Sequence, residues 1–150
     1  MGTSDTQEGK VKIQSKLIVV MDDGAICIRM NNGSSGALAR GDLVILDHAE
    51  GRNYVTNTTS EDSNLIIGMA YEAIAENASG LIQIYGPTKY LKVDGTDDIA
   101  AGDFISTFST AGIGQKGTIG SGNCIAISTE AYTSNNTSGV IDAFLLGSAR

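Results

Sequence analysis

The segment Leu38-Ala39-Arg40-Gly41-Asp42-Leu43-Val44 returns further along the chain as Ile99-Ala100-Ala101-Gly102-Asp103-Phe104-Ile105. Two shorter matches follow at nearly the same spacing, Glu72-Ala73 with Glu130-Ala131 and Ser79-Gly80-Leu81-Ile82 with Ser138-Gly139-Val140-Ile141. Similarity that recurs at one spacing along a chain indicates a duplicated structural unit. We therefore predict two related modules in this protein.

The local pattern on both sides of these segments predicts β-strands. Apolar residues occur in short runs or alternate with polar ones, and the runs end at Gly, Asn, Ser or Asp. The expected strands are Val11–Val20, Ala25–Met30, Asp42–Leu46, Asn53–Thr56, Ile66–Ile74, Leu81–Tyr85, Tyr90–Val93, Phe104–Phe108, Gln115–Thr118, Cys124–Thr129 and Val140–Leu146. Residues 65–78 are rich enough in Ala to pass for a short helix, but the repeat favours a strand there. The predicted fold class is all-β, a β-barrel or a β-sandwich.

The repeat also predicts how the chain is divided. Residues 1–24 are expected to form an N-terminal arm or edge strand, and residues 25–150 one β domain of two repeats, about 25–87 and 88–150. In each repeat a Gly-Asp pair, Gly41-Asp42 or Gly102-Asp103, precedes an apolar strand. Glycine can adopt the left-handed backbone that reverses the chain, and Asp can accept a hydrogen bond from a nearby backbone N–H. We interpret both pairs as structural turns.

Composition excludes several classes of protein. The 150 residues include 41% hydrophobic but only 5% aromatic side chains, 19 glycines, one proline and no tryptophan. A chain of this length can bury one core without a disulfide or metal, and here small and β-branched side chains must fill it. The net charge of -7 repels a phosphate backbone, so we expect no nucleic-acid partner. The apolar runs are too short for a membrane span, and the polar start lacks the order of a secretory signal, so cytoplasmic synthesis is expected.

The negative charge is unevenly distributed. In residues 1–30 the basic and acidic side chains cancel, and the stretch 9–21 carries three lysines and no acid. An arm of this kind can lie along an acidic neighbour, either a second copy or a larger assembly. The alternative is that its lysines protect an edge strand from aggregation. The candidate interface residues are Lys10, Val11, Lys12, Ile13, Lys16 and Leu17.

Residues that carry chemistry are sparse, and we predict no catalytic, metal-binding or cofactor-binding site. His48 is the only histidine, so neither a triad nor a histidine-based zinc site has a second imidazole to use. No nucleophile elbow or phosphate-binding loop occurs. The carboxylates at 21–24 and 94–98 lack the spacing of a calcium loop and are expected to bond within their own turns.

Two smaller features have ordinary structural interpretations. Arg40-Gly41-Asp42 spells an integrin-binding tripeptide, but the second copy keeps the Gly-Asp pair and has Ala101 in place of the arginine, so a turn explains both copies. Cys27 and Cys124 have apolar neighbours in predicted strands, and we expect buried, reduced thiols.

The second copy, Gly102 to Gly117 followed by Asn123-Cys124-Ile125-Ala126-Ile127 and Gly139-Val140-Ile141, resembles a β-module of tailed-bacteriophage structural proteins. The first copy is similar to it at residues 39–47, 67–70 and 80–84, and together the copies cover roughly residues 38–147. Such modules occur in capsid decoration, or cement, proteins and in fibre proteins. The short chain with its own Met1 looks more like a decoration protein than a fibre fragment.

The resemblance implies a mechanical role and no catalytic residue. It implies a structural virion protein, made in the host cytoplasm, that binds the capsid exterior as a homotrimer and bridges neighbouring major capsid subunits. Many weak contacts repeated by symmetry would then stabilise the shell. No cofactor, membrane or nucleic-acid partner is expected.

Two alternatives belong to other classes. A tail-fibre or baseplate module that binds a host receptor or glycan would need exposed aromatics on a groove, and the candidates are Tyr54, Tyr71, Tyr85, Tyr90 and Tyr132. A small β-barrel enzyme would need titratable residues converging in a pocket, which one histidine and scattered acids disfavour.

Overall fold

The computed structural model describes residues 17–118 and 123–147, where every regular element is a β-strand. The strands are β1 (Ile18–Val20), β2 (Ile26–Asn32), β3 (Leu43–Leu46), β4 (Tyr54–Thr56), β5 (Ile66–Ala70), β6 (Ser79–Val93), β7 (Phe104–Thr107), β8 (Gly114–Lys116), β9 (Ala126–Ser128) and β10 (Gly139–Leu146). The prediction of an all-β fold is therefore confirmed.

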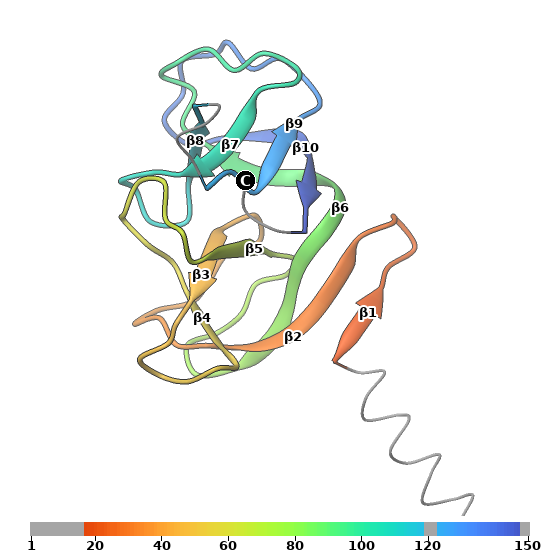
Figure 1. Cartoon of the computed structure of the whole chain (residues 1–150), viewed down its shortest axis with the longest axis vertical. Coiled ribbons are helices and arrows are strands. Elements are labelled where there is room, and N and C mark those ends of the chain that lie inside the picture. Colours follow the sequence, from red (N-terminus) through yellow and green to blue (C-terminus); the bar gives the residue numbers. More distant parts are fainter. Residues whose placement is uncertain (1–16, 119–122, 148–150) are drawn as a thin grey trace, which may run out of the picture.

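The strand pairings close into two rings that have one strand in common. In the first ring β2, β4, β3, β5 and β6 are neighbours in this order, and β6 pairs with β2 again. In the second ring the order is β6, β8, β7, β9 and β10, and β10 pairs with β6 again. A sheet closed in this way has no free edge except where strands are added, as β1 is added to β2. Figure 1 shows the two barrels one above the other, with β6 running through both.

The backbone reversals repeat along with the strands. Gly41 and Gly102 have φ angles of +92° and +94°. Two further pairs of left-handed residues, Gly51 with Gly112 and Gly86 with Gly147, lie at the same spacing, and Asn77 with Asn135 lies at a slightly shorter one. A short bridge between Leu38 and Ile74 in the first barrel has its equivalent between Ile99 and Tyr132 in the second. The duplicated sequence thus corresponds to a duplicated backbone.

The shared strand differs from the prediction. Leu81–Tyr85 and Tyr90–Val93 were expected as two strands but belong to one, β6, which crosses the expected repeat boundary between residues 87 and 88. Pro87 is tolerated because β2 pairs only as far as Tyr85, and at the proline only β10 lies alongside. Each half of β6 belongs mainly to one barrel, so the strand itself joins the two units.

Of two other predicted strands, one lies mostly outside the described residues and the other is shorter than expected. Of the predicted strand at residues 11–20, the structure describes only the last part, where β1 covers Ile18–Val20. The segment expected to be a strand at residues 66–74 is a strand rather than a helix, but β5 ends at Ala70. It ends there because the chain bends away before Ile74 returns to bridge Leu38.

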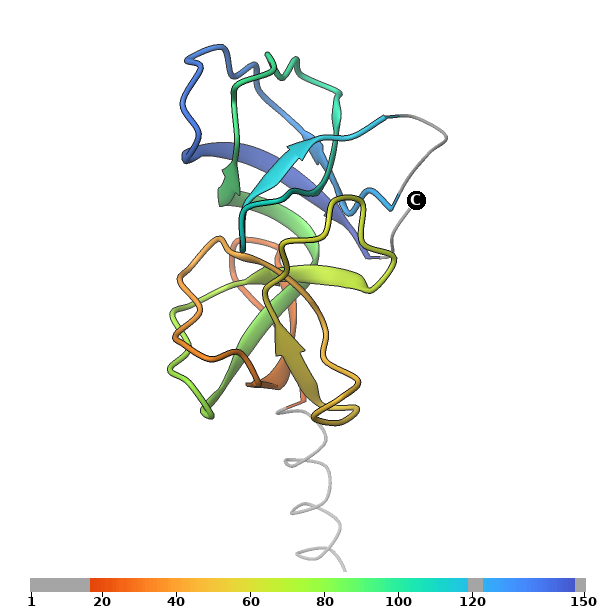
Figure 2. The same ribbon diagram turned by 90° about the vertical axis from the view of Figure 1, so that its left-hand side faces the viewer.

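The barrels also share a core. One buried cluster contains Leu43 and Met69 of the first barrel together with Leu91, Ile105 and Ile141 of the second. A second cluster, which includes Leu38, Val44 and Ile82, fills the first barrel alone. The loop between β4 and β5 also rises toward the second barrel, as Figure 2 shows. These contacts bind the two barrels into one body.

Candidate interaction surfaces

The two Gly-Asp turns have matching local geometry. Asp42 Oδ2 accepts a hydrogen bond from the Ala39 N–H at 2.7 Å, and Asp103 Oδ2 accepts one from the Ala100 N–H at 2.8 Å. In both turns the preceding glycine has a left-handed φ, which an L side chain adopts only under strain. Each carboxylate thus bonds within its own turn.

The two turns differ in what surrounds them. Gly41 lies so close to the second half of β6 that a Cβ would collide with the Tyr90 carbonyl oxygen, whereas a Cβ at Gly102 would meet nothing within 4 Å. Lys92 Nζ, also on β6, donates to Asp42 Oδ1 at 2.6 Å. The first turn is therefore a joint between the barrels, and the second lies at the surface.

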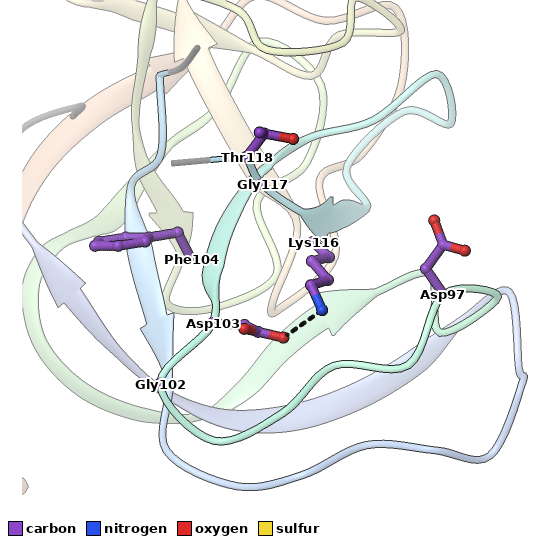
Figure 3. A pocket seen from close by; sticks show the side chains of 7 residues that line it. All are labelled: Asp97, Gly102, Asp103, Phe104, Lys116, Gly117 and Thr118. Atoms are coloured by element: carbon purple, nitrogen blue, oxygen red, sulfur yellow. Dashed lines mark ion pairs between the residues drawn. The ribbon is translucent and has the colours of Figure 1, made fainter. Parts of the chain in front are cut away.

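The second turn borders an open pocket of about 400 Å³, drawn in Figure 3. Asp103 and Lys116 form an ion pair of 2.9 Å across it, and Asp97 lies at its rim. The Ala100 N–H and the Lys116 ammonium hold the pKa of the Asp103 carboxyl below its usual value. The two charges of this pair therefore satisfy each other.

A second cavity, of about 300 Å³, lies where the barrels meet. The Arg40 guanidinium carbon lies 3.4 Å from the centre of the Tyr90 ring and 5.7 Å from that of Tyr71. Tyr71 in turn donates to Asp23 Oδ2 at 3.0 Å. Cation–π stacking explains why an arginine precedes this Gly-Asp pair, and it holds the tripeptide against the body of the protein. Tyr90 itself remains 40% exposed.

The predicted interface arm lies mostly outside the described residues. This holds for Lys10, Val11, Lys12, Ile13 and Lys16, and only Leu17 can be placed. Leu17 is 54% exposed, and Ile18 and Val20 of β1 are 60% and 71% exposed. Within the part of the chain that the structure describes, β1 pairs with β2 alone. The described end of the predicted arm therefore forms an exposed apolar edge beside β2.

A third hollow, larger than these two pockets, was not predicted from the sequence. It has a volume of about 550 Å³, lies at the end of the first barrel where β3 finishes, and is bordered by Leu17, Ile28, Leu46, Ile67, Ile84 and the arginines Arg29 and Arg52. Its apolar residues occur in predicted strands, where they are indistinguishable from core positions. No signal in the sequence could have shown that this end of the barrel is open.

The two cysteines lie in surroundings that suppress the reactivity of their thiols. Burial raises the pKa of the Cys27 thiol to about 11, helped by the Asp23 and Glu72 carboxylates, and burial also raises the pKa of Cys124. Both thiols are buried and unpaired, as predicted. Thiols held in the neutral form are poor nucleophiles.

Ligand-binding clusters are also missing from the described parts of the chain. Residues 17–118 and 123–147 contain no group of three or more His, Cys, Asp or Glu side chains placed to hold a metal ion. The Asp94 carboxylate, one of those considered for calcium, accepts a hydrogen bond from the Thr96 N–H instead. In the same residues no helix has the length and apolar character needed to cross a membrane.

The sequence matches no family model and no curated protein. The fold, however, is similar to that of the head fibre gp8.5 N base of bacteriophage phi29, with a TM-score of 0.54 and 12% sequence identity. The similarity covers 83% of this chain and 98% of the phage chain. This protein shares the fold of a phage head-fibre base. Because the likeness covers 83% of this chain, it extends over parts of both barrels.

Proposed function

We propose that this protein is a structural component of a bacteriophage virion. It binds the exterior of the capsid and stabilises the shell by bridging neighbouring major capsid subunits. The observation that carries the proposal is the pairing of two barrels through one strand, β6, in a fold that a phage head-fibre base also has. Two rigidly joined modules can span two binding positions without losing the free energy of ordering a linker.

The chemistry of the described residues supports a binding role rather than catalysis. The two ion pairs, Lys92 with Asp42 and Lys116 with Asp103, hold turns in place. None of the three pockets described above is lined by a histidine or a cysteine among the described residues, and these are the side chains that most often serve as catalytic base or activated nucleophile. We accordingly propose that the protein is not an enzyme and needs no cofactor.

Undecorated capsids of the phage that carries this gene provide the direct test. The purified full-length protein is expected to co-sediment with them at a saturating stoichiometry and to raise the temperature at which they release DNA. No binding at micromolar protein would overturn the proposal. Deleting residues 1–16 tests the lysine-bearing arm, and unchanged occupancy would eliminate that part of the proposal.

A homotrimer remains part of the proposal. The exposed Leu17, Ile18 and Val20 form a solvent-facing apolar edge that contact between copies would cover. Mass measurement by light scattering in solution checks it: a trimer is expected, and a monomer at all concentrations would exclude it.

One observation favours a second function, the binding of a host receptor or glycan. Tyr85 and Tyr90 are 43% and 40% exposed, and Tyr90 borders the cavity between the barrels beside Asp142 and Lys89. Sugars bind on exposed aromatic rings flanked by polar groups. A glycan array probed with the wild-type protein and with Tyr90→Ala distinguishes the two functions. Signals that disappear in the variant would favour the receptor-binding function.

A further inference from the structure

The two barrels are not equivalent at the end where β3 and β7 finish. Leu46 is the last residue of β3 and Thr107 the last of β7, and both strands follow a Gly-Asp turn. Thr107 is 1% exposed, whereas Leu46 is 36% exposed. The same position is therefore covered in one barrel and open in the other.

A loop of the first barrel covers the end of the second. Thr107 Oγ1 donates to the Ser60 carbonyl at 2.8 Å and accepts from the Ser63 N–H at 2.9 Å. The Asp62 carbonyl accepts from Asn123 Nδ2 at 2.8 Å, and the Asp62 N–H donates to the Thr107 carbonyl at 3.2 Å. The second barrel thus has its end closed by a backbone segment that precedes it in the chain (Figure 2).

The first barrel has no earlier module in the described chain to supply such a loop. At its end the hollow of about 550 Å³ remains, bordered by the apolar side chains of Ile28, Leu46, Ile67 and Ile84. We call this hollow the open-end groove. Leu46 occupies the position equivalent to Thr107, whose hydroxyl bonds to the β4–β5 loop. An occupant of the open-end groove therefore meets a hydrocarbon surface at this position instead of a hydroxyl.

The charge of the open-end groove is opposite to that of the protein. The chain carries a net charge of -7, yet the charged residues among the described ones that border the groove are Arg29 and Arg52, with no carboxylate. Both arginines are exposed, and neither has an ion-pair partner within residues 17–118 and 123–147. Guanidinium groups beside an apolar surface favour a segment that has both apolar side chains and carboxylates.

We propose that the open-end groove is a docking site for an extended, acidic and apolar segment of another protein. The segment takes the place that the β4–β5 loop occupies on the second barrel. An apolar side chain packs on Leu46, and carboxylates pair with Arg29 and Arg52. This deepens the proposed function, because it names the surface through which the protein contacts its partner.

The test selects ligands from a library of linear dodecapeptides with the immobilised full-length protein. We expect enrichment of peptides in which apolar residues alternate with Asp or Glu.

Variants of the groove test where the selected peptides bind. Leu46→Glu and the double variant Arg29→Glu with Arg52→Glu should each lower the affinity for the selected peptides at least about tenfold. The matched controls are Val140→Glu, an exposed apolar residue on β10 (49% exposed), and Lys89→Glu, an exposed cation on β6. Both should bind like the wild type. Thermal unfolding of every variant establishes that it is folded.

Several outcomes would overturn the inference. One is the absence of an acidic, apolar consensus, and another is a consensus whose binding the groove variants leave unchanged. Dissociation of a wild-type oligomer by Leu46→Glu would also overturn it, because the occupant would then be a second copy of the chain.

Capsid co-sedimentation separates the docking-site proposal from the proposed virion function. If the peptides bind the groove but capsids do not bind the protein, the proposed virion function is overturned and the docking site is supported. If capsids bind the protein but no peptide is selected, the docking site is overturned.

Discussion

Lys92 Nζ donates to Asp42 Oδ1 at 2.6 Å, and this bond joins the shared strand to the turn that starts β3. The Lys92 N–H also donates to the Gly41 carbonyl at 3.2 Å, and the Leu43 N–H to the Gly112 carbonyl at 2.9 Å. The first Gly-Asp turn is thereby held on both sides by the second half of the molecule. The equivalent turn at Asp103 pairs with Lys116 of its own barrel. Duplicated sequence has thus produced one joint and one surface turn.

Lys92→Met is expected to lower the free energy of unfolding by about 1 to 2 kcal/mol. The Asp42 side chain is only 12% exposed and would lose a charged partner. The matched variant Lys116→Met should cost less than about 0.5 kcal/mol, because both members of that pair are more exposed. Urea denaturation measures both values, and equal losses would contradict the distinction between joint and surface turn.

Gly41→Ala and Gly102→Ala separate backbone strain from collision. Both glycines have a left-handed φ, so each substitution should cost about 1 to 2 kcal/mol in strain. At Gly41 the added methyl also meets the Tyr90 carbonyl oxygen, and we expect a total loss of roughly 3 kcal/mol or more. Denaturant midpoints of the purified variants provide the comparison. A Gly41 variant as stable as its counterpart would show that β6 can move away from the turn.

Gln83→Leu should destabilise the middle of the shared strand. Gln83 is 1% exposed, and its Nε2 donates to the carbonyls of Tyr85, Gly86 and Pro87 at 3.3, 3.1 and 2.9 Å. Leucine would leave these acceptors without their donor, at a cost of roughly 2 kcal/mol.

Gln115→Leu is the control for that variant, because Gln115 is only half-buried and its Nε2 donates to one carbonyl, that of Thr107, at 3.2 Å. We expect a loss of less than about 1 kcal/mol there. Calorimetric unfolding temperatures check the order, and the same loss in both variants would argue against a special role for the buried amide.

Acid should weaken the second turn through Asp103. The pKa of its carboxyl lies below the ordinary value of 3.8 in the folded protein, because the Ala100 N–H and Lys116 favour the charged form. A lowered folded pKa gives stability that is complete above the unfolded pKa and is lost as the pH falls through the folded one. The difference in unfolding free energy between wild type and Asp103→Asn should therefore stay constant above about pH 5 and shrink below about pH 4.

Asp97→Asn is the control for this pH dependence. Asp97 borders the same pocket, but within the described residues it forms no ion pair. Urea midpoints measured across the pH range should follow the wild type. A difference between wild type and Asp103→Asn that does not shrink as the pH falls below about 4 would contradict the assignment.

Much of the architecture was predictable because its signals are local. Gly41-Asp42 and Gly102-Asp103 were identified as turns from their recurrence, and both have the left-handed glycine and the bonded carboxylate. The shared strand was not predicted, because Gly86-Pro87 is typical of a strand end when its neighbours are unknown. Pro87 fits only because one flank of β6 is unpaired there, which depends on where β2 stops.

The candidate surfaces were less predictable. Leu46 and Thr107 end equivalent strands, and nothing near them in the sequence shows that one is covered and the other is open. The difference arises from the loop at residues 60–63, which folds onto the following barrel and not onto its own.

The sequence by itself determined that this protein is built of β-strands and that its unit is duplicated, because residue alternation and turn-forming glycines act within a few residues. Only the tertiary structure decided that the two units share β6, that one Gly-Asp turn is a joint between them, and that one barrel end remains open. Those properties depend on which distant segments lie side by side, and pairing over such distances is settled only when the whole chain has folded.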